Sequence, residues 1–454
     1  MMPFFALLRG CNLLINRNFA LLWAGNFISR AGDIIFDTTL VLWVATTIAR
    51  GQPWAPLAVG GIAFAVSIPV LLVGPLAGVF VDRWNRRRIM LYMDAVRAVL
   101  IAILLLAANI FPLHLPVTWQ LGIIYLVSLL ASICSQFFNP AYIGLVGAIV
   151  DEADQVRASS RLQMAFYIAL IAGPPLGALL FFAVGAQLAI LLNALSFIAS
   201  FLALLWIRTS GAVKSAEEQP EANFLRESGE GLHFFASSRV LMTLLITVVI
   251  VLLGESAFST LGVFFITRNL HTPVSLYGYM NTASAIGLVA GTVVSNAVAQ
   301  RVGLARMYWL SLVISGVVIL CYARMTSFFP ALVALFLYGA LVALQNMTIL
   351  PLILHVTPQR LMGRTMAVFN PVGTLADMLA VALAGSLATA LRGFHANLLG
   401  LSFGPLDTIF LGAGVVIILS GLCAMVTMRD VTLPAKTEAG SKEATVVSSP
   451  TSEM

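Results

Sequence analysis

The sequence predicts an all-α membrane protein with twelve transmembrane helices in two six-helix bundles and both termini in the cytoplasm. Three observations support this prediction: a mostly apolar composition, twelve long apolar runs, and basic residues concentrated in alternate loops. Of the 454 residues, 60% are hydrophobic and only 10% are charged. Soluble domains are about 45–50% apolar and about 25% charged. Lipid must therefore be the solvent for most of the surface.

The apolar runs come as six, a polar interval, and six more. Each run reaches the roughly 20 residues that a helix needs to span a bilayer. Only helices and closed barrels satisfy the backbone in lipid, and barrel strands alternate polar with apolar residues, which these runs do not. We expect helices over 18–48, 57–81, 89–111, 118–145, 162–183, 187–207, 240–268, 275–299, 304–323, 329–353, 364–391 and 405–428.

The polar intervals divide the chain into five parts. The interval in the middle is rich in Glu, Lys and Arg, and we expect it to carry a surface helix near 224–235. The C-terminal stretch is rich in Ser, Thr, Glu, Lys and Ala, a composition typical of disorder. The predicted parts are a cytoplasmic segment 1–17, bundles over 18–207 and 240–428, a cytoplasmic linker 208–239 and a disordered tail 429–454.

The distribution of basic residues sets the orientation. Of the 25 lysines and arginines, two lie deep within predicted helices and four lie in loops or at helix ends on one side of the membrane. The remaining nineteen lie in segments on the other side. Because cytoplasmic loops carry the excess of Lys and Arg, this second side is the cytoplasm and holds both termini. The four residues on the outer side are Arg50, Arg268, Arg324 and Arg392.

A distinctive loop joins the second and third predicted helices. A loop on the cytoplasmic side explains its arginines, but not its single aspartate or the two glycines four residues apart. Glycines at this spacing leave a strip without side chains that another helix can approach closely. The residues that stand out in this segment are Gly74, Gly78, Asp82, Arg83, Arg86 and Arg87.

Residues 78–87 resemble the signature of the major facilitator superfamily, which reads Gly, three residues, Asp-Arg, one residue, Gly-Arg-Arg. Asn85 stands where the second glycine is usual, and Asn tolerates a left-handed backbone. The resemblance implies the major facilitator fold, in which this loop clasps neighbouring helix ends in one conformational state and releases them in the other. It places Asp82 near the start of the eleventh helix and the arginines near acids, with Asp94 and Asp151 as candidates.

Other segments extend the resemblance to about residues 18–429. Gly173, Pro174 and Gly177 in the fifth helix are similar to the Gly-Pro motif of antiporter-type members, although a simple kink would give the same pattern. Residues 138–141 and 357–364 resemble the macrolide-efflux and enterobactin-exporter branch of drug:proton antiporters. The resemblance implies a secondary active transporter of the bacterial cytoplasmic membrane.

Charged residues within the predicted helices are the candidates for ion coupling. Such groups are costly in lipid and usually face the protein interior or a wet cavity. Desolvation favours the protonated form of a carboxyl group, so a buried acid without a full partner can carry a proton across. A shift of 218 residues superimposes Asp37 on Glu255, in the first helix of each half. The candidates are Asp37, Glu255, Asp33, Asp377 and Arg30.

A structural ion-pair network is the competing interpretation for the charged residues of the first bundle. It applies to Arg30 with Asp33 and, more strongly, to Asp94 with Arg97, which lie one turn apart and nearer the cytoplasm. Many proton-coupled drug antiporters carry an arginine in the fourth helix, whereas this sequence has none there. Arg30 is the candidate replacement, and a uniporter or another coupling ion stays open as an alternative.

Sparse polar residues among aromatic and apolar ones favour an amphiphilic organic substrate over a sugar or a small ion. The candidate cavity residues are Trp23, Asn26, Gln136, Asn139, Gln163, Asn281, Gln345 and Asn346, each of which can equally be a packing residue. No nucleotide-binding loop, metal-ligand spacing or catalytic grouping occurs in the sequence. We therefore expect that the protein is not an enzyme and uses no ATP, cofactor or metal. We also expect no nucleic-acid partner and a monomeric state.

The sequence thus favours an exporter of hydrophobic or amphiphilic compounds, such as drugs or macrolides, in exchange for protons. A dedicated exporter of one metabolite such as a siderophore, or a lysophospholipid flippase, fits the same pattern. A membrane-embedded enzyme or a sensor is the alternative from a different class.

The lone acid among the loop arginines yields the first prediction. Asp82→Asn keeps the shape of the side chain and removes its charge, so we expect a lower transport rate with unchanged membrane insertion. Transport by reconstituted protein, normalised to the amount incorporated, measures the effect. A wild-type rate for the variant would contradict a conformational role for Asp82.

Overall fold

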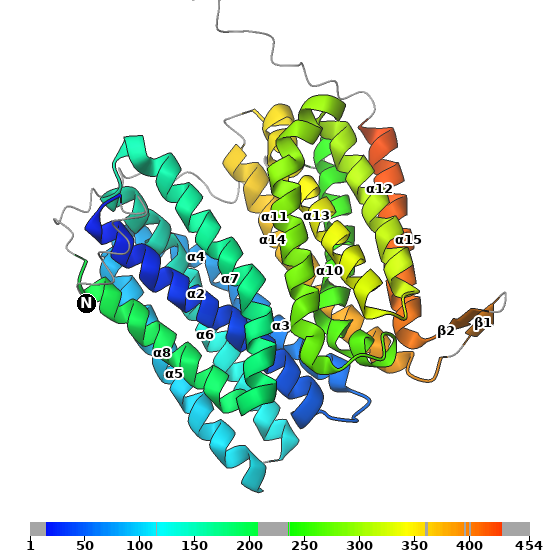
Figure 1. The fold of residues 1–454 in the computed structure, drawn as a ribbon. Coiled ribbons are helices and arrows are strands. Elements are labelled where there is room, and N and C mark those ends of the chain that lie inside the picture. Colours follow the sequence, from blue (N-terminus) through cyan, green and yellow to red (C-terminus); the bar gives the residue numbers. More distant parts are fainter. Residues whose placement is uncertain are drawn as a thin grey trace, which may run out of the picture.

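A computed structural model describes residues 15–114, 116–207, 235, 237–358, 362–394, 396–398 and 401–428. Within them, two bundles of helices lie beside each other and diverge toward one end (Figure 1). The expected tail 429–454, most of the expected segment 1–17 and most of the expected linker, including nearly all of its surface helix, lie outside the described residues.

Twelve helices in the described part of the chain are long and apolar enough to cross a membrane, which confirms the predicted number. The N-terminal bundle contains α2 (Arg17–Trp43) with the π-helical turn η1 (Val44–Ile48), α3 (Ala55–Leu72), α4 (Gly74–Arg83), α5 (Arg86–His114), α6 (Val117–Ile149), η2 (Glu152–Asp154), α7 (Gln155–Val184) and α8 (Ala186–Leu205).

The C-terminal bundle has six long helices and one small addition. A two-stranded antiparallel hairpin interrupts the otherwise helical architecture between the last two helices. The elements are α10 (Arg239–Arg268), η3 (Val274–Leu276), α11 (Tyr277–Val302), α12 (Leu304–Ala323), α13 (Phe328–Val356), α14 (Met362–Ala390), β1 (Ala396–Leu398), β2 (Leu401–Phe403) and α15 (Pro405–Thr427).

Both bundles use the same set of helix pairings. In the N-terminal bundle α2 packs against α7 and α8, α5 against α6 and α8, and α3 against α6. The C-terminal bundle repeats these pairs as α10 with α14 and α15, α12 with α13 and α15, and α11 with α13. The halves are therefore structural repeats, as the two sets of six apolar runs predict.

The predicted second helix, 57–81, is divided in the structure. α3 ends at Leu72 and α4 begins at Gly74. Pro75 has no N–H group and cannot bond to the carbonyl of Leu71, so the hydrogen-bond ladder is broken at this point. α4 consequently has its own direction and packs mainly against α6.

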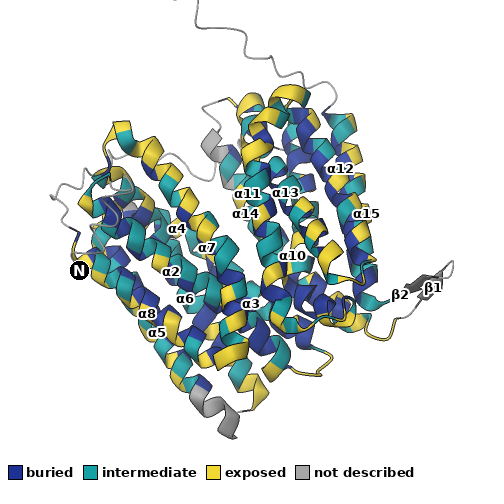
Figure 2. Cartoon of the chain, viewed as in Figure 1, coloured by how far each residue is buried: buried dark blue, intermediate teal, exposed yellow. Residues whose placement is uncertain are grey.

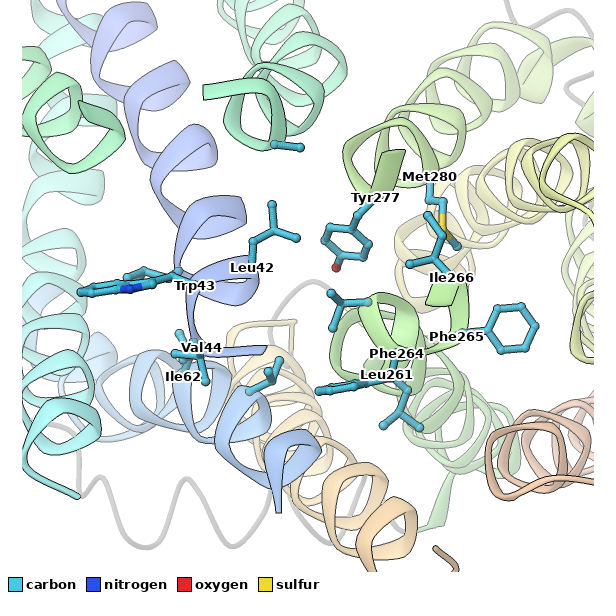
Figure 3. Packing of buried hydrophobic residues seen from close by; sticks show 14 of the residues in the cluster. Leu42, Trp43, Val44, Ile62, Leu261, Phe264, Phe265, Ile266, Tyr277 and Met280 are labelled. Carbon is cyan, nitrogen blue, oxygen red and sulfur yellow. The ribbon is translucent and has the colours of Figure 1, made fainter. Parts of the chain in front are cut away.

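Two helix pairs, α3 with α14 and α7 with α11, join the bundles. At the first pair, a Cβ atom added to Gly385 would lie 3.0 Å from the Cα atom of Leu57. One hydrophobic cluster extends across the junction, where Leu42 of α2 and Tyr277 of α11 point toward each other (Figure 3). Exposed residues follow the outer faces of the helices (Figure 2), and many of them are large and apolar, as lipid contact requires.

The closest helix contact within a bundle is between α11 and α13. A Cβ atom added to Gly287 would lie 1.9 Å from the carbonyl oxygen of Phe336, and one added to Gly339 would lie 2.0 Å from that of Ser284. Each helix therefore brings a glycine against the backbone of the other, the arrangement that permits close packing in membranes.

Gly287→Ala tests this contact. The added methyl group forces the helices apart, and overpacking of this kind costs about 1–3 kcal/mol. We expect a lower melting temperature for the purified protein in detergent. Gly412→Ala on α15 is the matched control, because a Cβ atom there would meet nothing within 4 Å. Equal melting temperatures for both variants would contradict the role of the glycine contact.

Candidate functional site

A buried ion pair lies at the centre of the N-terminal bundle. Arg97 donates to Asp94 one turn earlier on α5 at 2.5 Å, and the two side chains are 4% and 0% exposed. The guanidinium also lies over the rings of Phe138 and Phe197, 4.5 and 4.4 Å from their centroids. Ring faces attract cations, so the aromatic contacts and the carboxylate together hold the Arg97 charge.

Asp33 of α2 belongs to the same group of charges. It lies beside the amide of Asn193 on α8, within electrostatic reach of both Arg97 and Arg30. Two arginines therefore face two acids, Asp33 and Asp94, across two helices, α2 and α5. The sequence separated these residues into two local pairs, whereas the structure joins them in one network.

Arg30 also reaches the fourth transmembrane helix. Its Nη2 atom donates to Oδ1 of Asn139 on α6 at 2.6 Å. This contact brings an arginine charge to the helix that has no arginine of its own. Asn139 therefore has a defined partner, consistent with our choice of Arg30 as the residue that takes the place of the missing arginine.

Asp37 and Glu255 occupy equivalent helices, α2 and α10. Both side chains are exposed although both lie well inside their helices. Asp37 is within electrostatic reach of Asp33 and Arg30, whereas Glu255 is within reach of Asp377, another acid. The two positions thus have different electrostatic surroundings.

Asp377 of α14 touches both bundles. Its Oδ1 atom accepts from Ser256 of α10 at 2.8 Å, and its Oδ2 atom accepts from Ser67 of α3, in the other bundle, at 3.5 Å. Among the described residues, neither Asp377 nor Glu255 forms an ion pair. Two neighbouring acids therefore share one region of the C-terminal bundle with hydroxyl partners only.

Two arginines of the predicted loop lie at the start of α5 and donate to carbonyl groups of neighbouring helices. Arg86 donates to the carbonyl of Gly144 on α6 at 3.1 Å. Arg87 donates to the carbonyls of Leu204 and Leu205, at 2.9 and 2.7 Å, where α8 ends. Cations at a helix C-terminus satisfy its free carbonyls and its dipole.

Three expectations for this loop have different outcomes. Asp94 pairs with Arg97 rather than with the loop arginines. Asn85 does not adopt the left-handed backbone, and its side chain instead accepts from the Arg88 amide at 3.1 Å as the N-cap of α5. The side chain of Asp82, at the end of α4, lies outside those described, whereas the backbone of Arg83 completes α4.

The glycine strip of α4 is only partly covered. A Cβ atom at Gly74 would lie 3.3 Å from Oε1 of Gln136, whereas one at Gly78 would meet nothing within 4 Å. The space beside Gly78 is therefore open among the described residues.

The antiporter-type segment of α7 contacts two helices. A Cβ atom at Gly173 would lie 2.5 Å from Cγ2 of Ile34, and one at Gly177 would lie 2.8 Å from the carbonyl oxygen of Ile35. Both glycines therefore pack against α2. On the opposite side, the carbonyl oxygen of Pro174 would lie 2.4 Å from a Cβ atom at Gly278 of α11.

The prolines of this segment also create a hydrogen bond between the bundles. The carbonyl of Ile171 would bond to the amide of residue 175, but Pro175 has no N–H group. Thr282 of α11 supplies the missing donor, with its hydroxyl 2.7 Å from the Ile171 oxygen. The segment is thus both a break in the helical ladder and a contact site.

The predicted cavity residues do not form one group. Trp23 donates to the carbonyl of Arg161 at 3.1 Å, and Gln345, 3% exposed, donates to Ser315 at 3.2 Å inside the C-terminal bundle. Gln163 and Asn346 are exposed. The remaining ones have local neighbours: Asn26 beside Tyr142, Gln136 near the Ser132 carbonyl, and Asn281 in a cavity of the C-terminal bundle.

Sequence reasoning missed two features. The first is the cavity that Asn281 lines, which is built from aromatic side chains of several helices. In the sequence, the cavity is indicated only by tyrosines that interrupt apolar runs. The second is the burial of the Arg97 side chain inside the bundle. Position in the sequence alone does not show which face of a helix is buried.

Two repeated six-helix bundles, with charged side chains inside helices long and apolar enough to cross a membrane, are typical of a polytopic membrane transporter. The sequence model of the family described as MFS_3, transmembrane secretion effector, matches residues 11–430. The chain belongs to this family of the major facilitator superfamily. Its relatives are transporters rather than enzymes, and the chain is accordingly a multi-pass protein of a bacterial cell membrane with a small-molecule substrate.

Relatives with this architecture include efflux proteins. The chain is 28% identical to the multidrug efflux pump Tap of Mycolicibacterium fortuitum, over 80% of this chain and 91% of that protein. It is 25% identical to the MFS-type transporter YkuC of Bacillus subtilis, covering 89% and 90%. The macrolide efflux protein A of Streptococcus pyogenes is 24% identical over 50% of this chain and 53% of that protein.

Solved structures share the fold. The nucleoside transporter NupG, as a D323A mutant, superposes with a TM-score of 0.70 at 14% identity, over 91% of this chain and all of that one. A bacterial homologue of the iron transporter ferroportin in an inward-facing state gives a TM-score of 0.68 at 16% identity, covering 91% and 98%.

The buried ion pair gives a prediction with an internal control. Asp94→Asn leaves the Arg97 charge buried with less compensation, and breaking a buried pair costs about 3–5 kcal/mol. Asp154→Asn removes an acid from a pair with the same residue types and spacing, Arg157–Asp154, whose side chains are 75% and 33% exposed. Exposed pairs contribute about 0.2–1 kcal/mol.

We expect Asp94→Asn to lower the melting temperature of the detergent-solubilised protein much more than Asp154→Asn does. The temperature-dependent loss of the monodisperse peak in size-exclusion chromatography measures both. Similar losses for the two variants would show that the network of Asp94, Arg97, Arg30 and Asp33 does not stabilise the bundle.

Proposed function

We propose that this protein exports hydrophobic or amphiphilic small molecules, such as drugs or macrolides, in exchange for protons. The names of its relatives, a multidrug efflux pump and a macrolide efflux protein, support the direction and the substrate class. The two bundles, with limits at 18–207 and 240–428, are the units that rock against each other around a monomer's central site.

The observation that carries proton exchange is the pair of neighbouring acids in the C-terminal bundle. Glu255 and Asp377 repel each other when both are charged, and among the described residues no basic side chain pairs with either. Binding one proton relieves that repulsion. Asp377 also accepts from Ser67 of the other bundle, so the protonation state acts on the α3–α14 contact.

Asp37 is the coupling candidate of the N-terminal bundle. Its exposed carboxylate lies inside a transmembrane helix, where contact with lipid is costly, so it faces the space between the bundles. The Arg30–Asn139 bond and the balanced charges around Asp33 keep that region neutral without it. Asp37 is thus an additional acid that can bind or release a proton.

The position of the contacts between the two bundles supports alternating access. The close contacts Leu57–Gly385 and Pro174–Gly278 lie toward the predicted outer ends of their helices. The bundles diverge at the other end (Figure 1), and the face around Gly78 is uncovered there. We infer a state open to the cytoplasm, and we propose that Gly78 and Asp82 engage the start of α14 in the opposite state.

Two other substrate classes remain as alternatives: a single secreted metabolite such as a siderophore, and a lysophospholipid. Deletion in an efflux-deficient host separates them. Loss of tolerance to many compounds supports drug export, retention of one metabolite supports the specialist, and altered leaflet distribution of lysophospholipid supports a flippase.

Coupling is tested with a neutral substrate chosen from that panel, in inside-out proteoliposomes with an imposed proton gradient. We expect Glu255→Gln and Asp37→Asn each to abolish accumulation against the substrate gradient, because the proton site is lost. Downhill exchange of the same compound persists in both variants. Asp154→Asn, an acid on the exposed surface, serves as the control and retains uphill transport.

Proton-driven accumulation at the wild-type level in both variants would remove Glu255 and Asp37 as coupling residues. Loss of downhill exchange as well would instead indicate damage to folding or substrate binding, which size-exclusion chromatography of the same samples distinguishes.

A further inference from the structure

An aromatic cavity lies within the C-terminal bundle, between α10, α11, α12 and α13. Its volume is about 160 Å³. For comparison, an engineered cavity of about 150 Å³ holds one benzene molecule. The lining residues are Glu255, Phe258, Ser259, Gly262, Tyr277, Met280, Asn281, Ser284, Tyr322, Leu335 and Tyr338.

Two buried hydroxyl groups line this cavity without a partner. Tyr322 and Tyr338 are 1% and 4% exposed, and neither hydroxyl forms a hydrogen bond among the described residues. Native structures rarely leave a buried hydroxyl unpaired, because its desolvation is then uncompensated. The two hydroxyls beside the cavity therefore have hydrogen-bonding capacity that a polar ligand can use.

Aromatic rings form one wall. The ring of Phe258 lies 5.0 Å from that of Tyr322 and 4.9 Å from that of Tyr338, centroid to centroid. Such a cluster offers several ring faces and edges in a small volume. Ring faces attract cations, and the attraction is stronger where water is excluded.

The charge in the cavity is negative. Glu255 has its exposed carboxylate here and acts electrostatically on Tyr338. Asp377 of α14, also an acid, acts electrostatically on Glu255, and the described lining of the cavity contains no Lys, Arg or His. A cation is therefore the complementary ligand, and an anion is excluded by repulsion.

We propose that this cavity binds the protonated amino group of an amphiphilic substrate, together with one ring or an apolar group of similar size. The ammonium N–H groups donate to the Glu255 carboxylate and to the hydroxyl oxygens of Tyr322 and Tyr338. The apolar part packs against Phe258. This assignment makes basic amines the preferred substrates and so rests on the proposed export function, although binding is measured without transport.

The experiment compares benzylamine, charged at neutral pH, with benzyl alcohol, a neutral compound of nearly the same shape. Isothermal titration uses the purified full chain in phosphatidylcholine nanodiscs, with empty nanodiscs subtracted. We expect benzylamine to bind at least about tenfold more tightly, which corresponds to roughly 1.4 kcal/mol from the Glu255 carboxylate and the ring faces together. Glu255→Gln should remove most of this difference and leave the affinity for benzyl alcohol unchanged.

Tyrosine variants separate the ring from the hydroxyl. Tyr338→Phe keeps the ring and should weaken benzylamine binding about threefold, whereas Tyr338→Leu should weaken it about tenfold. The control is Tyr308→Phe on α12, whose hydroxyl lies 2.6 Å from that of Thr247 outside the cavity. We expect this control to bind benzylamine like the wild type.

Equal affinity of the wild type for benzylamine and benzyl alcohol would overturn the proposal and leave water as the occupant. Benzylamine binding that survives Glu255→Gln would overturn it too, as would a titration in which only Na⁺ binds. These outcomes are independent of proton coupling, because no gradient is present. Conversely, if uphill export of a neutral compound fails while benzylamine still binds, the proposed proton coupling is contradicted and the amine site is not.

Discussion

The constraint on which the structure depends is that a charge within lipid must be neutralised by the protein itself. The N-terminal bundle meets this constraint around Arg97 with a carboxylate, two aromatic rings and a second acid near one guanidinium. Buried pairs contribute little net stability against an apolar alternative. What the network provides is a fixed relative placement of α2, α5, α6 and α8, since each supplies a charged, aromatic or polar side chain.

The junction between the bundles depends instead on residues that lack a side chain or a backbone N–H group. Gly385 and Gly278 lack side chains where α14 and α11 meet the N-terminal bundle, and Pro175 lacks the N–H group that would otherwise compete for the Ile171 carbonyl. Contacts of this kind bring backbones close without long interdigitating side chains. Separating the surfaces therefore costs few specific interactions, a condition for two conformations of similar free energy.

The sequence determines the helices well because apolar length and loop charge report directly on the membrane. Pro75 shows where this reasoning fails. The apolar run continues past it, but the backbone hydrogen bonding of the helix is broken there. The site was less predictable. Gln345 is as polar as Asn139, yet it packs against Ser315 while Asn139 receives Arg30. Which face of a helix is buried, and against which distant helix, depends on rotation and packing that linear spacing does not specify.

Asp37 and Glu255 show how equivalent positions of a repeat acquire different chemistry. Both lie in the first helix of their half, and both are exposed inside the span. Asp37 has both an acid, Asp33, and an arginine, Arg30, within electrostatic reach, whereas Glu255 has a second acid and a wall of tyrosines. A carboxylate beside an acid and a fixed cation is partly compensated, so an incoming positive charge gains less from it. A carboxylate beside another acid gains from any cation, whether a proton or an amine, because that cation removes a repulsion and adds an attraction. Recognition of a cationic substrate is therefore favoured in the C-terminal bundle, whereas Asp37 lies beside the charge network of the N-terminal bundle.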